Sequence, residues 1–213
     1  MSKKLVLVDG SSYLYRAFHA MPNLANSRGE STGAVYGIVN MLRRLLREQD
    51  TPYFVVVFDA PGKTFRDRLY SDYKANRPPM PEELRSQIDK VHAVIKALGL
   101  PLLSIADVEA DDVIGTLARA APEHGMEAFI VSGDKDLAQL VGPGVVMCDS
   151  MKDVLYDPAG VADRFGVRPD QIVDFLALVG DTSDNIPGVP KVGPKTAARW
   201  LAEYGTLDKL VEQ

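Results

Sequence analysis

The sequence is poor in the residues on which several kinds of metal and redox site depend. It has a single cysteine, Cys148, and three histidines among 213 residues. One cysteine excludes an internal disulfide framework and any zinc site built from several thiolates. The histidines show neither a metal-site spacing nor a triad arrangement. A lone cysteine without a recognisable secretory signal is typical of a reducing cytoplasm, and we expect that location.

Long apolar runs are also missing. No stretch approaches the roughly 20 apolar residues that a membrane-spanning helix needs, so no membrane partner is expected. The chain is 46% hydrophobic and 25% charged, an average composition that excludes a disordered chain, a coiled coil and a collagen-like repeat. Its 213 residues suffice for one large domain, or for one domain with a small appendage.

What the chain does contain is an alternation of short apolar runs and amphipathic segments. Strands are predicted at 5–8, 54–58, 102–105 and 128–131, and helices at 12–20, 33–49, after Pro81, at 111–121 and at 195–204. The strands are continuous apolar runs, which is typical of strands covered on both faces. The pattern predicts an α/β fold with a central, mostly parallel sheet flanked by helices.

Acidic residues follow these strands where each one ends, and a further pair follows the apolar run 175–179. Since the carboxyl ends of parallel strands share one edge of a sheet, we expect these side chains to converge there. Close carboxylates need a counter-charge, and two Mg²⁺ or Mn²⁺ ions, which prefer oxygen ligands, would supply it. The set comprises nine residues: Asp9, Asp59, Glu109, Asp111, Asp112, Asp134, Asp136, Asp181 and Asp184.

Each acidic segment alone has a simpler interpretation. Aspartate is a preferred turn residue and helix N-cap, so any one of them can be just that. Coincidence of five such segments on one edge is the weaker explanation, and the set favours a metal site.

The net charge of −5 at first argues against a polyanionic partner. Without the nine carboxylates, the 29 acidic residues fall to 20, against 24 basic ones, which leaves +4. A metal-neutralised acidic pocket within a mildly basic surface suits a phosphodiester substrate.

Two segments break the strand–helix rhythm. Residues 60–81, here called the basic segment, carry five basic against two acidic side chains, interleaved with aromatic ones. The stretch 185–201 has basic but no acidic side chains, and its turns at Gly188 and Gly193 present backbone amides to an anion.

In order, the stretches VDGSSYLYRAFHA, VVFDAPGKTFRDRLYSDYKANRPPMP, VEADDVIGTLA, SGDKDLAQLV and GDTSDNIPGVPKVGPKTAARWL resemble the 5′-nuclease family. That family includes the N-terminal domain of bacterial DNA polymerase I and the flap endonucleases, within the PIN-like superfamily. The resemblance covers essentially the whole chain. It implies a PIN-like catalytic core over 1–180 with a helical arch at about 60–95. It also implies a helix-three-turn-helix DNA-binding region over 181–213, shorter than is usual in the family.

The resemblance also implies roles for individual residues. Asp9, Asp59, Glu109, Asp111 and Asp112 would serve mainly one metal region, and Asp134, Asp136, Asp181 and Asp184 the other. Tyr73, Lys74 and Arg77 would act at the scissile phosphate, together with Arg16. DNA contacts would come from Lys63, Arg66, Lys191, Lys195, Gly188 and Gly193, with a K⁺ ion at the last element in many family members.

Simpler interpretations stand beside these roles. Taken alone, Tyr73, Lys74 and Arg77 would belong to an exposed, solvated basic helix, and Arg16 would form an ordinary surface salt bridge.

The resulting prediction is a monomeric, metal-dependent, structure-specific 5′ nuclease in the bacterial cytoplasm, at the nucleoid. As a 5′-3′ exonuclease and flap endonuclease it would hydrolyse phosphodiester bonds near junctions of single- and double-stranded DNA. Its substrate would be DNA with a 5′ flap, a nick or an RNA primer, and its partner a DNA polymerase, linked or separate. The alternative is a non-catalytic DNA-binding module of the same fold.

Overall fold

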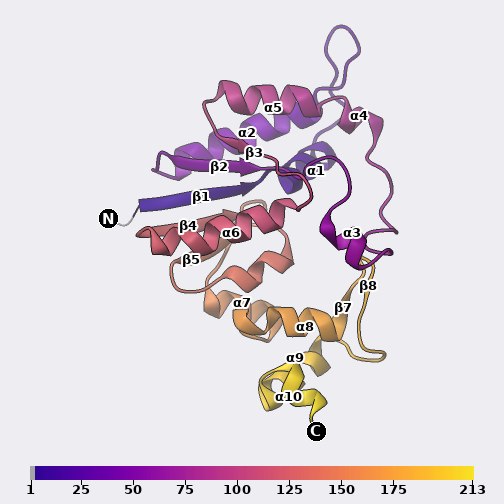
Figure 1. Cartoon of the computed structure of the whole chain (residues 1–213). Coiled ribbons are helices and arrows are strands. Elements are labelled where there is room, and N and C mark those ends of the chain that lie inside the picture. Colours follow the sequence, from indigo (N-terminus) through magenta and orange to yellow (C-terminus); the bar gives the residue numbers. More distant parts are fainter. Residues whose placement is uncertain (1–2) are drawn as a thin grey trace.

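The centre of the molecule is a six-stranded sheet, seen in a computed structural model that describes residues 3–213 (Figure 1). The strand order is β3-β2-β1-β4-β5-β6, and every neighbouring pair is parallel except β5 and β6. The prediction of a mostly parallel sheet is therefore confirmed. The strands are β1 (Lys3–Asp9), β2 (Tyr53–Val57), β3 (Leu102–Leu103), β4 (Met126–Val131), β5 (Val145–Asp149) and β6 (Val154–Tyr156).

Successive residues of the buried strands point to opposite faces of the sheet. Both faces therefore carry apolar side chains, and helices cover both. Val6 and Val8 pack against α1 (Gly10–Ala20), α2 (Gly33–Glu48) and α5 (Ile88–Ala97). Leu7 and Ile130 pack into the other core, with α6 (Ala110–Glu123), α7 (Pro158–Phe165) and α8 (Ile172–Val179). The buried stretches of the central strands, Val6–Val8 and Ala128–Val131, are thus apolar on both faces.

The C-terminal part continues from α8 through a small hairpin to two more helices. The hairpin pairs β7 (Gly180–Asp181) with β8 (Ile186–Pro187) in antiparallel fashion. It leads into α9 (Pro194–Tyr204) and α10 (Leu207–Val211), which lie beyond α8 in Figure 1. Proline suits the first position of α9, because a backbone N–H at that position would have no intrahelical hydrogen-bond partner.

The basic segment crosses from β2 toward this hairpin with little regular structure. It holds one short helix, α3 (Phe65–Leu69), followed by turns, and the prolines after Arg77 are incompatible with a helix interior. Figure 1 shows α3 beside β7 and β8.

Several sequence expectations need correction. The helix after Pro81 is two helices, α4 (Glu82–Arg85) and α5. The apolar run 175–179, preceding an acidic pair, belongs to helix α8 rather than a strand. Strands β5 and β6 and helix α7 were not predicted, and β6 is mostly exposed. No helix in residues 3–213 is both long and apolar enough to cross a membrane.

Candidate metal centre and active site

The predicted convergence of acidic side chains occurs at the carboxyl edge of the sheet. Asp9 ends β1 and caps α1, where it accepts a hydrogen bond of 2.8 Å from the Ser12 N–H. Asp59 follows β2 and accepts one from the backbone N–H of Ala110, at the start of α6. Asp134 follows β4 and caps the 3₁₀ helix η1 (Lys135–Leu140).

Four of these carboxylates form a first group: Asp9, Asp59, Asp111 and Asp134. Burial, reinforced by the charges of Asp134, Asp9 and Asp59, raises the pKa of Asp111 to about 8. Burial likewise raises the pKa of Asp9 to about 6, although hydrogen bonds from Ser132 and Ser12 oppose it. Burial is the main cause of both shifts, and repulsion between the neighbouring carboxylates adds to it.

Asp136, Asp181 and Asp184 form a second group, with ligand oxygens all within 4.8 Å of one another. Burial and the charges of Asp134 and Asp181 raise the pKa of Asp136 to about 7. Asp134 also accepts a hydrogen bond from the Asp136 N–H at 3.0 Å, so its carboxylate contacts the second group as well.

A divalent cation fits this donor set. Within residues 3–213, the Oδ1 atom of Asp136 is buried and has no hydrogen-bond partner, which is costly for a carboxylate oxygen. Two further carboxylates lie within reach of the same point. Hard divalent cations bind oxygen ligands, and this cluster offers several, including one buried oxygen without a hydrogen-bond partner.

Several of the carboxylates, including Asp181 and Asp184 of the second group, form ion pairs with cations, most of which come from the basic segment. Arg66 forms a bidentate pair with Asp112, at 2.6 and 2.7 Å, and its hydrogen bonds lower the pKa of that carboxyl. The Lys74 ammonium lies 2.7 Å from Glu109, and Arg77 pairs with Asp184. Lys135 lies 3.1 Å from Asp181.

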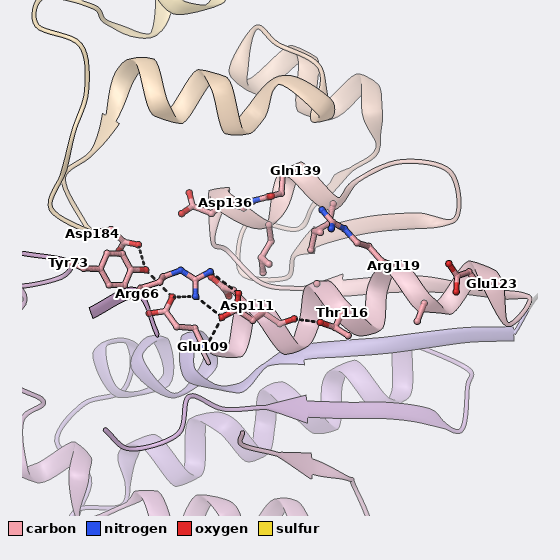
Figure 2. A pocket seen from close by; sticks show the side chains of 15 residues that line it. Arg66, Tyr73, Glu109, Asp111, Thr116, Arg119, Glu123, Asp136, Gln139 and Asp184 are labelled. Atoms are coloured by element: carbon pink, nitrogen blue, oxygen red, sulfur yellow. Dashed lines mark hydrogen bonds and ion pairs between the residues drawn. The ribbon is translucent and has the colours of Figure 1, made fainter. Parts of the chain in front are cut away.

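Tyr73 completes this contact between the basic segment and the acidic groups. Its hydroxyl is 3.0 Å from both Glu109 and Asp184. Burial and the two carboxylates raise the pKa of Tyr73. Figure 2 shows Arg66, Tyr73, Glu109 and Asp184 gathered at one end of the pocket.

Backbone contacts hold the basic segment to the acidic loop, residues 181–185. The Lys74 N–H donates to the Asp184 carbonyl at 2.9 Å, and the Asn76 amide donates to the Thr182 carbonyl at 2.7 Å. In return, the Asn185 side-chain amide donates to the Asp72 carbonyl at 2.8 Å.

Lys74 and Asn185 both have left-handed backbone conformations, with φ of 54° and 58°. Such a conformation costs free energy in a residue with a side chain, and the contacts between the two segments compensate for it.

The acidic groups open into a pocket of about 640 Å³ that runs along α6. It is lined near the carboxylates by Arg66 and Tyr73, and it extends past Thr116 to Arg119 and Glu123 (Figure 2). The pocket is thus acidic at the sheet edge and has mixed charge farther along the helix.

Other predicted site residues lie outside this contact. Arg16 donates to Asp149 at 2.8 Å, and because Asp149 is buried at 1% exposure, this is not the surface salt bridge of the simpler interpretation. Lys63 is exposed at the start of the basic segment. Exposed Lys191 and Lys195, together with Gly188 and Gly193, lie between β8 and the first turn of α9.

Sequence reasoning missed three residues that support the site. Asp149 ends β5 as Asp9 ends β1, so the strand-end rule would have found it had β5 been recognised. Ser132 and Lys135 flank the aspartates of the SGDKD stretch, but no local signal indicates their contacts with Asp9 and Asp181.

A parallel α/β sheet with a cation-binding acidic pocket at its carboxyl edge, covered by a basic segment, is the arrangement of a metal-dependent nuclease. Residues 4–166 match the family described as the 5′-3′ exonuclease N-terminal resolvase-like domain. Residues 167–213 match the C-terminal SAM fold of the same exonucleases. The chain belongs to the 5′-3′ exonuclease family.

Individual relatives agree with this assignment. The chain is 54% identical over 216 residues to DNA polymerase I of Pseudomonas aeruginosa, covering 98% of this chain and 24% of the relative. It is 45% identical to a 5′-3′ exonuclease of Aquifex aeolicus, covering 99% of this chain and 73% of the relative. The chain therefore spans about a quarter of the polymerase and most of the exonuclease.

Solved structures share the fold at lower identity. The 5′-exonuclease of phage T5 with bound zinc superposes with a TM-score of 0.82 at 22% identity, covering 99% of this chain and 79% of the other. A T5 flap endonuclease complex with DNA and metal ions gives 0.83 at 21% identity, with the same coverage.

Proposed function

We propose that the chain is a 5′ nuclease that hydrolyses DNA phosphodiester bonds near single-strand/double-strand junctions, using two Mg²⁺ or Mn²⁺ ions. The observation that carries this proposal is the meeting of two carboxylate groups at the sheet edge, with Asp134 between them and a buried, unpartnered Asp136 oxygen. The family assignment supports a 5′-3′ direction for the reaction.

The cations would be held by the carboxylates that have no ion pair among the described residues, chiefly Asp9, Asp111, Asp134 and Asp136, with Asp181 and Asp184 beside them. Bound there, they would supply a nucleophilic water at neutral pH and stabilise the leaving 3′-oxygen. Hydrolysis would leave a 5′-phosphate and a 3′-hydroxyl.

The basic segment would bind and orient the substrate. Lys74 and Arg77 now neutralise Glu109 and Asp184, and a phosphate arriving at the cations would compete for the same two side chains. Both can stabilise charge that develops on the phosphate, while the Tyr73 ring offers a base a stacking face. Arg16, beside Gly133, and Arg66 would hold the residues that carry the carboxylates.

The region beyond β7 would hold the duplex. Its exposed Lys191 and Lys195 lie near the start of α9, where free backbone N–H groups favour a phosphate. We include a K⁺ ion near the Gly188 and Gly193 turns in this proposal, to be tested by the K⁺ dependence of duplex binding.

In the cell, the activity would remove 5′ flaps or RNA primers ahead of a DNA polymerase, linked or separate, at the nucleoid. The relatives named DNA polymerase I support such a partnership.

The test is cleavage of a 5′-labelled flap duplex with Mg²⁺ or with EDTA, followed by gel analysis. Mg²⁺-dependent release of a short product is expected, with Asp134→Ala abolishing cleavage but retaining DNA binding. A folded protein that binds the duplex without cutting it would favour the non-catalytic DNA-binding module instead.

A further inference from the structure

Ser132 lies at the junction of the two carboxylate groups. It directly follows β4 and is buried at 1% exposure. Its hydroxyl oxygen is 2.6 Å from Oδ2 of Asp9 and 3.0 Å from the backbone nitrogen of Asp134. One hydroxyl therefore contacts two acidic segments, one of which, at Asp9, is 123 residues from Ser132 in sequence.

The direction of these hydrogen bonds follows from the chemistry of the groups. The backbone N–H of Asp134 can only donate, so the Ser132 oxygen accepts there. The single hydroxyl proton then points to Asp9 Oδ2. The other oxygen of Asp9 accepts the Ser12 N–H at 2.8 Å, so each carboxylate oxygen is held by one bond and keeps a lone pair for a cation.

The chain of hydrogen bonds extends into the second group. Oδ1 of Asp134 accepts the backbone N–H of Asp136 at 3.0 Å. A continuous series of bonds therefore runs from Asp9 through Ser132 and Asp134 to Asp136. The Ser132 hydroxyl is its central member, and among the described residues it is the group hydrogen-bonded to Asp9 Oδ2.

The turn that carries Ser132 is fixed from its other side by Arg16. A Cβ atom at Gly133 would overlap the Arg16 guanidinium, which is itself anchored to buried Asp149. Removal of the Ser132 hydroxyl would thus release Asp9 Oδ2 and the Asp134 N–H, while the contact of Gly133 with Arg16 and the bond from Ser12 to Asp9 remain.

We propose that Ser132 is a positioning residue that orients Asp9 and the Asp134 turn toward a shared divalent cation. This inference deepens the proposed function and rests on the same site. Groups that orient metal ligands typically contribute 10- to 100-fold to metal affinity. The effect should therefore appear in cation binding itself, before any substrate is present.

The experiment measures Mn²⁺ binding to the metal-free protein by the electron paramagnetic resonance signal of free Mn²⁺. Ser132→Ala should weaken binding of the tighter Mn²⁺ ion roughly 10-fold or more, and Ser132→Thr, which keeps the hydroxyl, should recover most of it. The half-saturating Mg²⁺ concentration for flap cleavage should rise by a similar factor, while the rate at saturating Mg²⁺ changes much less.

Ser150→Ala is the matched control, because Ser150 is also a partly buried, hydrogen-bonded serine after a strand, but its partner is Tyr13. It should leave Mn²⁺ binding unchanged. Wild-type Mn²⁺ affinity in folded Ser132→Ala would overturn the inference, as would equal weakening by alanine and threonine. If the alanine variant does not fold, Ser132→Cys, with a weaker donor of similar size, replaces it under the same criteria.

Failure of this inference can be told apart from failure of the proposed function. Mn²⁺ binding is read without DNA, so a wild-type protein that binds Mn²⁺ but cuts no flap would refute the nuclease proposal alone.

Discussion

The ammonium of Lys74 lies 2.7 Å from a carboxylate oxygen of Glu109, inside the group of acids that is suited to divalent cations. The same pattern recurs where Arg66 pairs with Asp112 and Arg77 with Asp184. The basic segment therefore supplies positive charge to three of the carboxylates, whereas Asp111, which has no ion pair among the described residues, has a raised pKa. We propose that the unpaired carboxylates are left for cations and that the three ion pairs exchange for a phosphate when substrate binds.

Replacing Lys74 by alanine tests this exchange. We expect flap cleavage to fall roughly 100-fold, because a preorganised positive charge at the phosphate would be lost. Duplex binding should fall by much less, since other cations contact the backbone. Rates under single-turnover conditions and a separate binding titration measure the two effects. Lys90→Ala is the control, since exposed Lys90 forms a comparable pair with Glu30, 3.1 Å away and on another surface. Equal losses for both lysine variants would contradict the assignment.

The sequence predicted the features that local patterns determine. Apolar runs predicted four strands, and Asp9, directly after Val8, and Asp134, three residues after Val131, marked the edge where the carboxylates meet. Strand β5 was not predicted, although it ends at Asp149, the buried partner of Arg16.

Long-range pairing could not be predicted from sequence. Lys74 and Glu109 are 35 residues apart, and Arg77 and Asp184 are 107 apart. No local spacing indicates that the basic segment folds onto the acidic loop, because those contacts depend on tertiary packing. The resemblance to nucleases suggested a phosphate partner for these cations, whereas the structure shows them on carboxylates.

Removing the Arg66 side chain should loosen the basic segment. Its bidentate pair with Asp112 ties α3 to the first turn of α6, and both side chains are about 30% exposed. We expect Arg66→Ala to speed proteolytic cleavage within residues 60–81 several-fold, because cleavage follows the population of the open segment. Mass spectrometry of the early fragments locates the cut. Arg168→Ala breaks an exposed pair with Asp170 and should leave the cleavage pattern unchanged. An identical pattern in the Arg66 variant would refute the tether.

The metal-free protein should lose stability as pH rises from about 4 to about 8. Asp9, Asp136 and Asp111 have folded-state pKa values of about 6, 7 and 8, above the ordinary 3.8. The folded protein therefore retains protons that the unfolded chain has lost, and unfolding becomes easier with rising pH in this window. Below pH 4 the penalty is absent, and above pH 8 it is complete.

Urea unfolding in EDTA at pH 5 and pH 8 measures this dependence. At about 1.4 kcal/mol per pKa unit, the free energy of unfolding should drop by at least about 2 kcal/mol. Mg²⁺ should restore stability at pH 8 more than at pH 5, because it replaces the missing counter-charge. Asp136→Asn should flatten the pH dependence in EDTA and reduce the Mg²⁺ effect. A metal-free protein that is more stable at pH 8 than at pH 5 would contradict the assignment of these carboxyls.

Alanine substitution should change the stability of the protein at one glycine after β7 and not at another. A Cβ atom at Gly188 would overlap the carbonyl of Val179 at the end of α8, whereas one at Gly193 meets nothing within 4 Å. Backbone cannot yield as a flexible side chain does, so Gly188→Ala should lower the free energy of unfolding by about 1–3 kcal/mol. Gly193→Ala should leave it nearly unchanged, because Gly193 has a negative φ that alanine tolerates.

Measuring duplex DNA binding by the two variants then distinguishes a role of these turns in packing from a direct role in DNA binding. If close packing of Gly188 against α8 sets the course of the chain into α9, Gly188→Ala should weaken duplex binding even under conditions where the variant remains folded. Gly193→Ala should bind within about 2-fold of wild type, because the backbone N–H groups at the start of α9 stay exposed. Fluorescence anisotropy with a blunt duplex measures both. Unchanged binding by a folded Gly188 variant would show that the hairpin of β7 and β8 does not position the helix that is proposed to hold DNA.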